Sequence, residues 1–214
     1  RMHHAGVRCV DCHEPHTGKR LIPDNMLCMR CHIGGTTPPA TVIDPATHGK
    51  HAGYTDGNDC TDCHMPITNY MQRHPRHDHG FTIPDPLLTK EFGVPNACNR
   101  CHTDKDADWA LKHTDEWYGE KMNRPTRTRA ILVAKARRGD PEARAGLIEL
   151  LKTEPIDAWK APLCHLLERW SMLPDAGAAL VAQLASPSPL VREAAARSLV
   201  HPCRRNDPAV RKAI

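Results

Sequence analysis

The stretch Cys9-Val10-Asp11-Cys12-His13 is the first of four Cys-x-x-Cys-His motifs in the first half of this 214-residue chain. The other three are Cys28-Met29-Arg30-Cys31-His32, Cys60-Thr61-Asp62-Cys63-His64 and Cys98-Asn99-Arg100-Cys101-His102. Random placement of 10 Cys and 15 His in 214 residues would produce about 0.03 such motifs. The repetition therefore has a chemical cause.

Cys-x-x-Cys-His is the attachment signature of a c-type haem. The two cysteines add to the porphyrin vinyl groups, and the histidine that follows is placed to bind the iron from one face. The motifs thus predict four covalent haem c groups. The attachment residues are Cys9, Cys12, Cys28, Cys31, Cys60, Cys63, Cys98 and Cys101, and the iron ligands are His13, His32, His64 and His102.

Two other interpretations of the cysteines remain open. A disulfide framework is common in exported chains with an even number of cysteines, and pairs of Cys-x-x-Cys also bind zinc. Neither interpretation requires a histidine directly after each pair. Cys164 and Cys203 lie outside the motifs in apolar helical settings, where we expect buried thiols.

Composition separates the two halves of the chain. Aromatic residues make up only 4% of it, and residues 1–115 have few aliphatic runs from which to build a core, so we expect the porphyrins to be the core of this half. Up to His113 there are 12 Lys and Arg against 13 Asp and Glu; from Thr114 onward there are 17 against 12. The basic tail is more typical of a solvated helical face than of a nucleic-acid site.

The expected fold is mainly α, with little regular structure in the haem half. We expect a tetrahaem cytochrome c domain over 1–119 and a HEAT-like α-solenoid over 120–214, with a plain helical bundle as the alternative. Proline- and glycine-rich connections in the first domain predict loops. The expected helices are short ones at each haem histidine, then 106–118, 126–138, 141–152, 156–170, 174–185, 189–200 and 208 onward.

Three of these helices share an opening in which Asp or Ser precedes Pro and an Arg follows three residues after the Pro. The openings are Asp140-Pro141-Glu142-Ala143-Arg144, Ser188-Pro189-Leu190-Val191-Arg192 and Asp207-Pro208-Ala209-Val210-Arg211. Asp or Ser caps the first amides, and proline is accommodated at the first helical position. The recurrence of this opening favours repeated helices.

Each predicted iron has a second axial position. Eleven histidines lie outside the motifs, and eight of them are in the haem segment, so bis-histidine ligation and low potentials are expected. His16 lies too close to His13 to reach around the same haem. His48 and His51 would face one way if helical and could serve two adjacent haems. Asp78 could orient the imidazole of His79, while His113, His165 and His201 are expected at the surface.

Several segments resemble a family of bacterial multihaem c-type cytochromes with TPR or HEAT repeats, distantly similar to nitrogen-cycle multihaem cytochromes. The segments are 6–19, 63–66, 76–84 and 95–105, together with Trp109 and 117–119. The resemblance covers about residues 2–119 and implies distal iron ligands at His4, His16, His48, His51 and His79. These are five candidates for four haems, so one of them is expected to serve a haem outside this chain. Because family members are usually longer, we also expect this sequence to be a piece of a longer protein.

Electron transfer is the function favoured by these patterns. Its expected partners are other redox proteins or copies of the same chain, with the helical tail as a docking surface; neither nucleic-acid binding nor a transmembrane segment is expected. The alternative is a multihaem oxidoreductase of small nitrogen or sulfur compounds with one open iron site. Haem c is attached outside the cytoplasm, so a periplasmic or extracellular location is expected.

Overall fold

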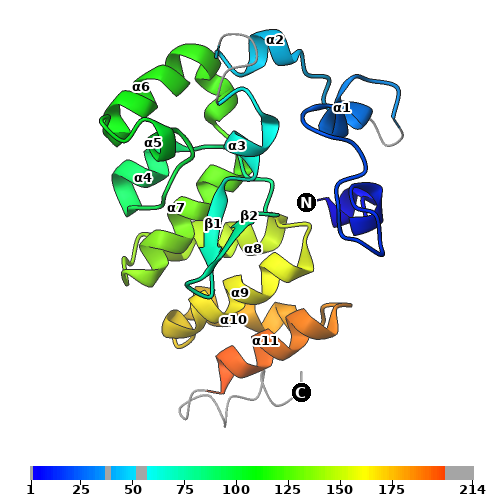
Figure 1. The fold of residues 1–214 in the computed structure, drawn as a ribbon. Helices are drawn as coiled ribbons and strands as arrows, with labels where there is room; N and C mark the ends of the chain where they lie inside the picture. Colours follow the sequence, from blue (N-terminus) through cyan, green and yellow to red (C-terminus); the bar gives the residue numbers. More distant parts are fainter. Residues whose placement is uncertain (1, 37–39, 52–56, 201–214) are drawn as a thin grey trace. The chain divides into compact units, whose positions relative to one another are not determined.

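The computed structural model describes residues 2–36, 40–51 and 57–200, and its contacts divide the chain into two units that meet between Gly119 and Glu120. Among the described residues, helices dominate both units (Figure 1). No described helix is both long and apolar enough to span a membrane.

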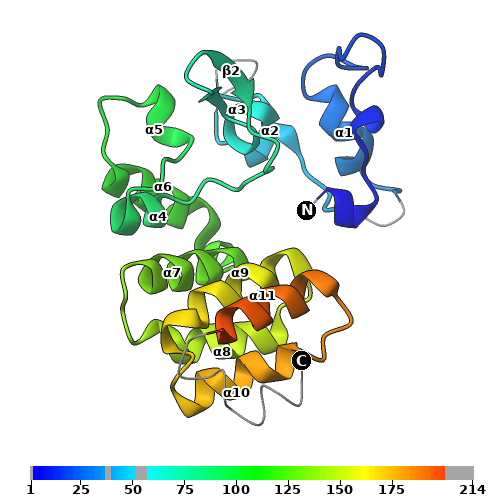
Figure 2. The ribbon, with the colours of Figure 1, turned by 90° about the horizontal axis from the view of Figure 1, so that it is seen from below.

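The first unit consists of short helices joined by long connections (Figures 1 and 2). Its elements are η1 (His3–Ala5), η2 (Cys9–Asp11), α1 (Met26–His32), α2 (Pro45–His48), α3 (Cys60–His64), β1 (Ile67–Tyr70), β2 (His74–His77), α4 (Pro86–Phe92), α5 (Cys98–Cys101) and α6 (Ala107–Tyr118). The four motifs lie at η2, α1, α3 and α5, but only α1 and α3 include their motif histidine. The short helices expected at the haem histidines are therefore confirmed for His32 and His64, whereas His13 lies beyond the 3₁₀ turn η2 and His102 is the C-cap of α5.

Strands β1 and β2 form an antiparallel hairpin that the sequence analysis did not predict. All eight strand residues are exposed, so the hairpin lacks the apolar alternation by which a half-buried strand is recognised. Its turn places Met71 and Gln72 at positive φ, the geometry of a tight hairpin turn, for which Asn and Gly are the usual sequence signal. The Arg76 guanidinium lies over the Tyr70 ring, 4.8 Å from its centroid, and links the two strands.

The second unit is built from helices that pack on one another. Its elements are η3 (Gly119–Met122), which spans the boundary, α7 (Pro125–Arg137), α8 (Ala143–Thr153), α9 (Asp157–Leu167), η4 (Glu168–Trp170), α10 (Pro174–Gln183) and α11 (Pro189–Leu199). Helix α9 packs beside α8 and α11, and α10 beside α11 (Figure 2). The five helices expected within 126–200 are confirmed, while the helix expected from 208 lies outside the described residues.

The two described helix openings do not both show the expected side-chain cap followed by proline at the first helical position. Asp140 accepts a hydrogen bond from the backbone N–H of Glu142, but α8 begins only at Ala143, so Pro141 lies in the preceding turn. Pro189 does occupy the first position of α11, yet the Ser188 side chain makes no cap hydrogen bond. Instead Arg192 donates to the carbonyls of Ser186 and Pro187, at 2.8 and 2.9 Å. Arg192 therefore anchors the loop that leads into α11, whereas Arg144 of the first opening pairs with the Asp175 carboxylate at 3.0 Å.

The hydrophobic core lies in the second unit. Its largest fully buried side chains are Leu147, Leu151, Leu163, Leu167, Leu180, Val191 and Leu199. Cys164 is buried among them, as expected, and burial raises the pKa of its thiol to about 11. Burying a leucine of this kind contributes about 2 kcal/mol, so this unit has its own source of stability.

The first unit has little core. From residue 2 to Asp85 no described residue is buried; the buried ones are Pro86, Asn96, Ala97, Ala110 and Thr114, at α4, α6 and the segment between α4 and α5. The polypeptide alone therefore supplies little apolar burial over its first 85 residues, where three of the four motifs lie.

We predict that a haem-free chain, made by replacing the eight motif cysteines with alanine, folds only in its second unit. Hydrogen–deuterium exchange followed by mass spectrometry should show protected amides in α8, α9 and α11 and rapid exchange in α1 and α3, because only the former have a core. The haem-loaded chain is the control. Protection of α1 and α3 without haem would contradict the prediction.

An ion pair between Arg129 and Glu154 is buried in the second unit, with 2.8 Å between the Arg129 Nη2 and Glu154 Oε2 atoms. Only 1% of the Glu154 side chain is exposed. Its other oxygen accepts a hydrogen bond from the Ile156 amide at 3.1 Å, and the Arg129 guanidinium lies over the Trp159 ring. This carboxylate therefore connects α7 to the start of α9.

We predict that Glu154→Ala lowers the free energy of unfolding by about 3 kcal/mol, because it leaves the Arg129 charge buried without its partner. Glu149→Ala is the control: it removes the exposed pair with Lys152 and should cost below about 1 kcal/mol. Urea denaturation followed by far-UV circular dichroism measures both. Equal losses in the two variants would show that burial of the pair is unimportant.

Candidate functional site

Three of the four motif histidines are each held in one orientation by a backbone carbonyl. The Nδ1 atoms of His13, His32 and His64 lie 2.8, 2.7 and 2.8 Å from the carbonyl oxygens of Gly18, Thr41 and Thr82. Since a carbonyl only accepts, Nδ1 carries the proton in each ring. The Nε2 atom is then left with its lone pair, which is the tautomer required to bind a metal through Nε2.

The same arrangement recurs at three described histidines outside the motifs, one of which is His77, whose Nδ1 lies 2.7 Å from the Met65 carbonyl oxygen. The Nδ1 of His51 lies 2.7 Å from the carbonyl oxygen of Gly49, and the Nδ1 of His79 lies 2.9 Å from that of His77. Asp78 was expected to orient His79, and this expectation is wrong: the Asp78 carboxylate accepts from the Gly80 amide at 2.7 Å. The His77 carbonyl orients the His79 ring instead, because it lies only two residues earlier in the chain.

Three of the motif histidines each face a histidine outside the motifs, which we call an outer histidine. The ring centroids are 6.2 Å apart for His13 and His79, 6.0 Å for His48 and His64, and 6.2 Å for His51 and His102. The angles between the ring planes are 32°, 18° and 28°. These separations are too long for direct ring stacking and leave room between the rings.

The spacing fits an iron between two imidazoles. A metal–nitrogen distance of about 2 Å on each side, together with about 1.1 Å from each nitrogen to its ring centre, gives about 6.2 Å between centroids. The residues present therefore fit a haem iron at three of the four motifs. Helix α3 contains both cysteines and the histidine of its motif, α5 ends at Cys101 just before His102, and η2 ends at Asp11 just before Cys12 and His13.

The remaining candidates are placed differently. The His4 side chain lies outside the described part of the structure. His16 is exposed, and its backbone amide donates to Glu14 at 3.1 Å. Among the side chains that the structure describes, His32 has no second imidazole at the distance seen in the other three pairs. His48 ends α2 and His51 follows it, so the helical pairing expected for these two histidines is wrong, although each faces a different motif histidine.

The four motifs follow one another in space as they do in sequence. The Cys12 thiol has its pKa raised by burial and by the charge of Cys28, from the second motif. Cys28 and Cys60 are hydrogen-bonded, which lowers the pKa of Cys28 to about 6 and raises that of Cys60. Burial, and then the charge of Cys98, raises the pKa of Cys63 to about 11. Each motif is therefore a neighbour of the next.

Asn25 joins the second and third motifs directly. Its side-chain amide donates to the Asn58 carbonyl at 2.9 Å and accepts from the Cys60 amide at 2.7 Å. The residue before α1 thus holds the start of α3. Asn25 lies outside the Cys-x-x-Cys-His pattern, and no local signal in the sequence distinguishes it.

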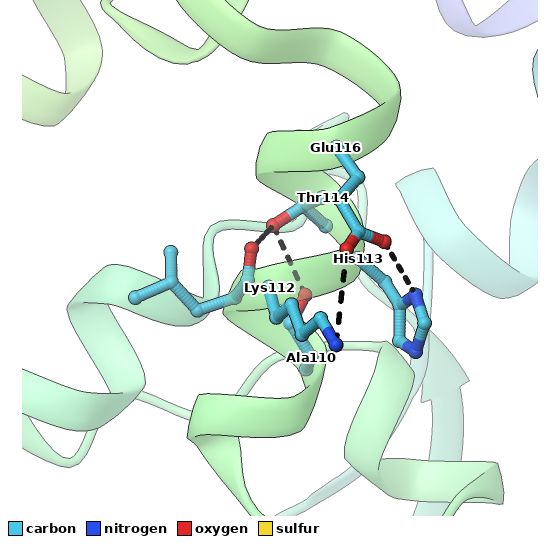
Figure 3. Close-up of polar contacts among 6 residues, drawn as sticks. Ala110, Lys112, His113, Thr114 and Glu116 are labelled. Carbon is cyan, nitrogen blue, oxygen red and sulfur yellow. Dashed lines mark hydrogen bonds and ion pairs between the residues drawn. The ribbon is translucent and has the colours of Figure 1, made fainter.

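Helix α6 carries a row of aromatic and histidine rings on one face. Trp109, His113 and Trp117 recur every four residues on one face, with centroids 4.7 and 5.4 Å apart. Trp109 also lies 4.7 Å from the ring of His102. His113 was expected to be a plain surface residue, but it is half-buried and its Nδ1 lies 3.2 Å from the Glu116 carboxylate (Figure 3).

The last residue of α6 reaches another histidine. Tyr118 donates from its hydroxyl to the His48 carbonyl at 2.6 Å, and the two rings are 5.9 Å apart. Burial raises the pKa of Tyr118, with a further contribution from the charges of Cys63 and Cys98. Helix α6 therefore contacts His102 near its start and His48 at its end.

The other interpretations of the cysteines gain no support. The eight motif cysteines and Cys164 are all unbridged. No group of three or more His, Cys, Asp or Glu side chains among the described residues is arranged to hold a metal ion by itself. A c-type haem is different, because it needs thioether links and one or two imidazoles rather than a closed set of ligands.

Residues 46–147 match the family model of cytochrome c552. The match supports a multihaem c-type cytochrome. It covers the third and fourth motifs, together with His48, His51, His79 and α6, and it implies covalently bound haem c. No curated protein and no solved structure matches significantly. The similarity points to c-type haem electron transfer or to nitrite-reductase-like chemistry, with redox partners in either case.

Proposed function

We propose that this protein transfers electrons through four covalently bound haem c groups held in a row. The observation that carries the proposal is the set of three imidazole pairs with centroids 6.0–6.2 Å apart. Haem iron supplies reversible one-electron chemistry when it is bound. The residues of the chain attach the groups, fill their axial positions and keep neighbouring groups close together.

The pairs assign ligands to three of the four motifs. His13 and His79 would bind one iron, His64 and His48 a second, and His102 and His51 a third. His32 would bind the remaining iron, with His4 or His16 as its second ligand. Two imidazoles at each iron leave no coordination position for a substrate, so electron transfer without bond formation at the metal is favoured.

The order of the motifs supports a linear path. Side chains of successive motifs lie close enough to shift one another's pKa: Cys28 acts on Cys12, Cys60 on Cys28, and Cys98 on Cys63. A row of this kind has two ends, and we propose that other redox proteins or further copies of this chain meet them. We also propose that the second unit is a HEAT-like docking surface and that the protein acts in the periplasm or outside the cell.

A nitrite-reductase-like or related oxidoreductase is the second candidate. It requires one iron with an open position, and the second motif is the place for it, because no described imidazole is paired with His32. The two candidates differ in a measurable property of the irons.

We predict that the oxidised, haem-loaded protein shows only low-spin signals in electron paramagnetic resonance. The optical spectrum of the reduced protein should not change with carbon monoxide, because both axial positions of every iron are filled. A high-spin signal from one haem in four, with a matching carbon monoxide shift, would instead favour the oxidoreductase. The mass of the protein gives the haem count in the same sample.

We predict that His79→Ala converts one haem in four to a high-spin form that binds carbon monoxide, because His13 keeps its iron but loses the ring opposite. His74→Ala is the matched control: His74 is an exposed histidine on the nearby strand β2 and should leave all four haems low-spin. An unchanged spectrum for His79→Ala would remove this pair from the proposal. The same comparison of His4→Ala with His16→Ala identifies the second ligand of the His32 iron.

A further inference from the structure

His102 differs from the other motif histidines in what surrounds its outer nitrogen. His13, His32 and His64 each donate from Nδ1 to a backbone carbonyl at 2.7–2.8 Å. Among the described residues, the His102 Nδ1 has no such carbonyl partner. Its ring instead lies 4.7 Å from that of Trp109, at 47° between the planes.

The local sequence explains why no carbonyl reaches His102. The loop after the fourth motif turns back at once, and the Asn99 side chain donates to the carbonyls of Lys105 and Asp106, at 2.9 and 3.2 Å. The Asp106 carboxylate accepts from the Trp109 amide at 2.8 Å and so starts α6. The first turn of this helix then brings the indole, rather than a carbonyl, against His102.

Trp109 contacts a second ring besides that of His102. Its ring contacts His113, whose own position is held by Glu116 (Figure 3). The opposite side of the helix is packed as well: Thr114 is buried and donates to the carbonyls of Ala110 and Leu111. The indole is therefore placed by the helix and by its neighbouring ring.

Two of the carboxylates near this part of the chain are paired with cations, while the Asp106 carboxylate accepts from the Trp109 amide. Asp108 lies 2.6 Å from Lys90, and Asp104 lies 2.8 Å from Lys105. Their negative charges are thus partly offset beside the fourth motif. The difference in hydrogen bonding at His102 is a local feature that distinguishes this motif from the other three.

The missing hydrogen bond has a chemical consequence. A histidine that donates from Nδ1 to a carbonyl is a more basic ligand, and a more basic ligand stabilises the oxidised iron. A histidine without that bond donates less charge, so the reduced iron is favoured and the potential rises. Outer hydrogen bonding is one of the levers by which a protein sets a haem potential.

Resting on the proposed function, we propose that Trp109 is a positioning residue that makes the fourth-motif haem the one of highest reduction potential in this chain. Trp109 acts through His102. The His102 ring packs against the indole, so its Nδ1 reaches no backbone acceptor among the described residues. Electrons that enter the row then collect at the haem attached to Cys98 and Cys101. This places the electron-accepting end of the row beside α6.

The unmodified, haem-loaded protein tests the order of reduction. In a reductive titration followed by proton nuclear magnetic resonance, the haem whose methyl protons show Overhauser contacts to the Trp109 indole should be reduced first. If this haem is reduced second, third or last, the proposal is overturned. The measurement needs no variant, so it does not depend on the folding of one.

Variants at Trp109 test the cause. Trp109→Gln offers an amide oxygen where the indole stood and should lower the highest of the four potentials, with the other three unchanged. Trp109→Phe retains a ring, and Trp117→Phe alters an exposed ring two turns further along α6; both should leave the order unchanged. A Trp109→Gln protein with four haems and an unaltered highest potential would overturn the assignment of Trp109.

The same samples separate this inference from the function on which it rests. Mass spectrometry gives the haem count and electron paramagnetic resonance gives the spin state. Fewer than four haems, or high-spin iron in the unmodified protein, would count against the proposed function. Four low-spin haems reduced in a different order would overturn only the role of Trp109.

Discussion

The first unit depends on imidazoles that face one another across about 6 Å. These pairs join segments that are distant in sequence: His13 meets His79, and His51 meets His102. The unit has little buried apolar surface of its own before α4, so side-chain packing alone cannot hold these segments together. A haem between the rings would supply the missing apolar surface, and its iron would bind both imidazoles of a pair.

Helix α6 contacts two of these imidazole pairs and helps to position them. Its row of rings contacts His102 at one end, and Tyr118 holds the His48 carbonyl at the other. A regular helix keeps these contact points at a constant separation. Two of the three imidazole pairs are thus tied to the same element, whereas loops carry most of the remaining histidines.

The second unit is stabilised by the burial of apolar side chains between its helices. Its leucines and valine form a core, and the buried Arg129–Glu154 pair connects α7 to the start of α9. The pattern of Ala, Leu, Arg and Glu was sufficient to predict the helices over 126–200, because an apolar stripe with a period of 3.6 is a strong local signal. Their boundaries shifted where a proline lay in a turn rather than in the helix, as at Pro141.

The amino-acid sequence by itself determined the local features of the haem half: the four motifs, the short helices that carry them and the helix after the last motif. Each of these depends on residues a few positions apart, so no distant contact is needed to specify it. Only the tertiary structure decided which outer histidine faces which motif, that Asn25 joins two motifs, and that His102 lies against Trp109. The hairpin from Ile67 to His77 also required the structure, because its exposed residues lack the alternation that marks a strand. Such features arise between segments that lie far apart along the chain or have no local pattern, and the spacing of residues in a sequence does not encode them.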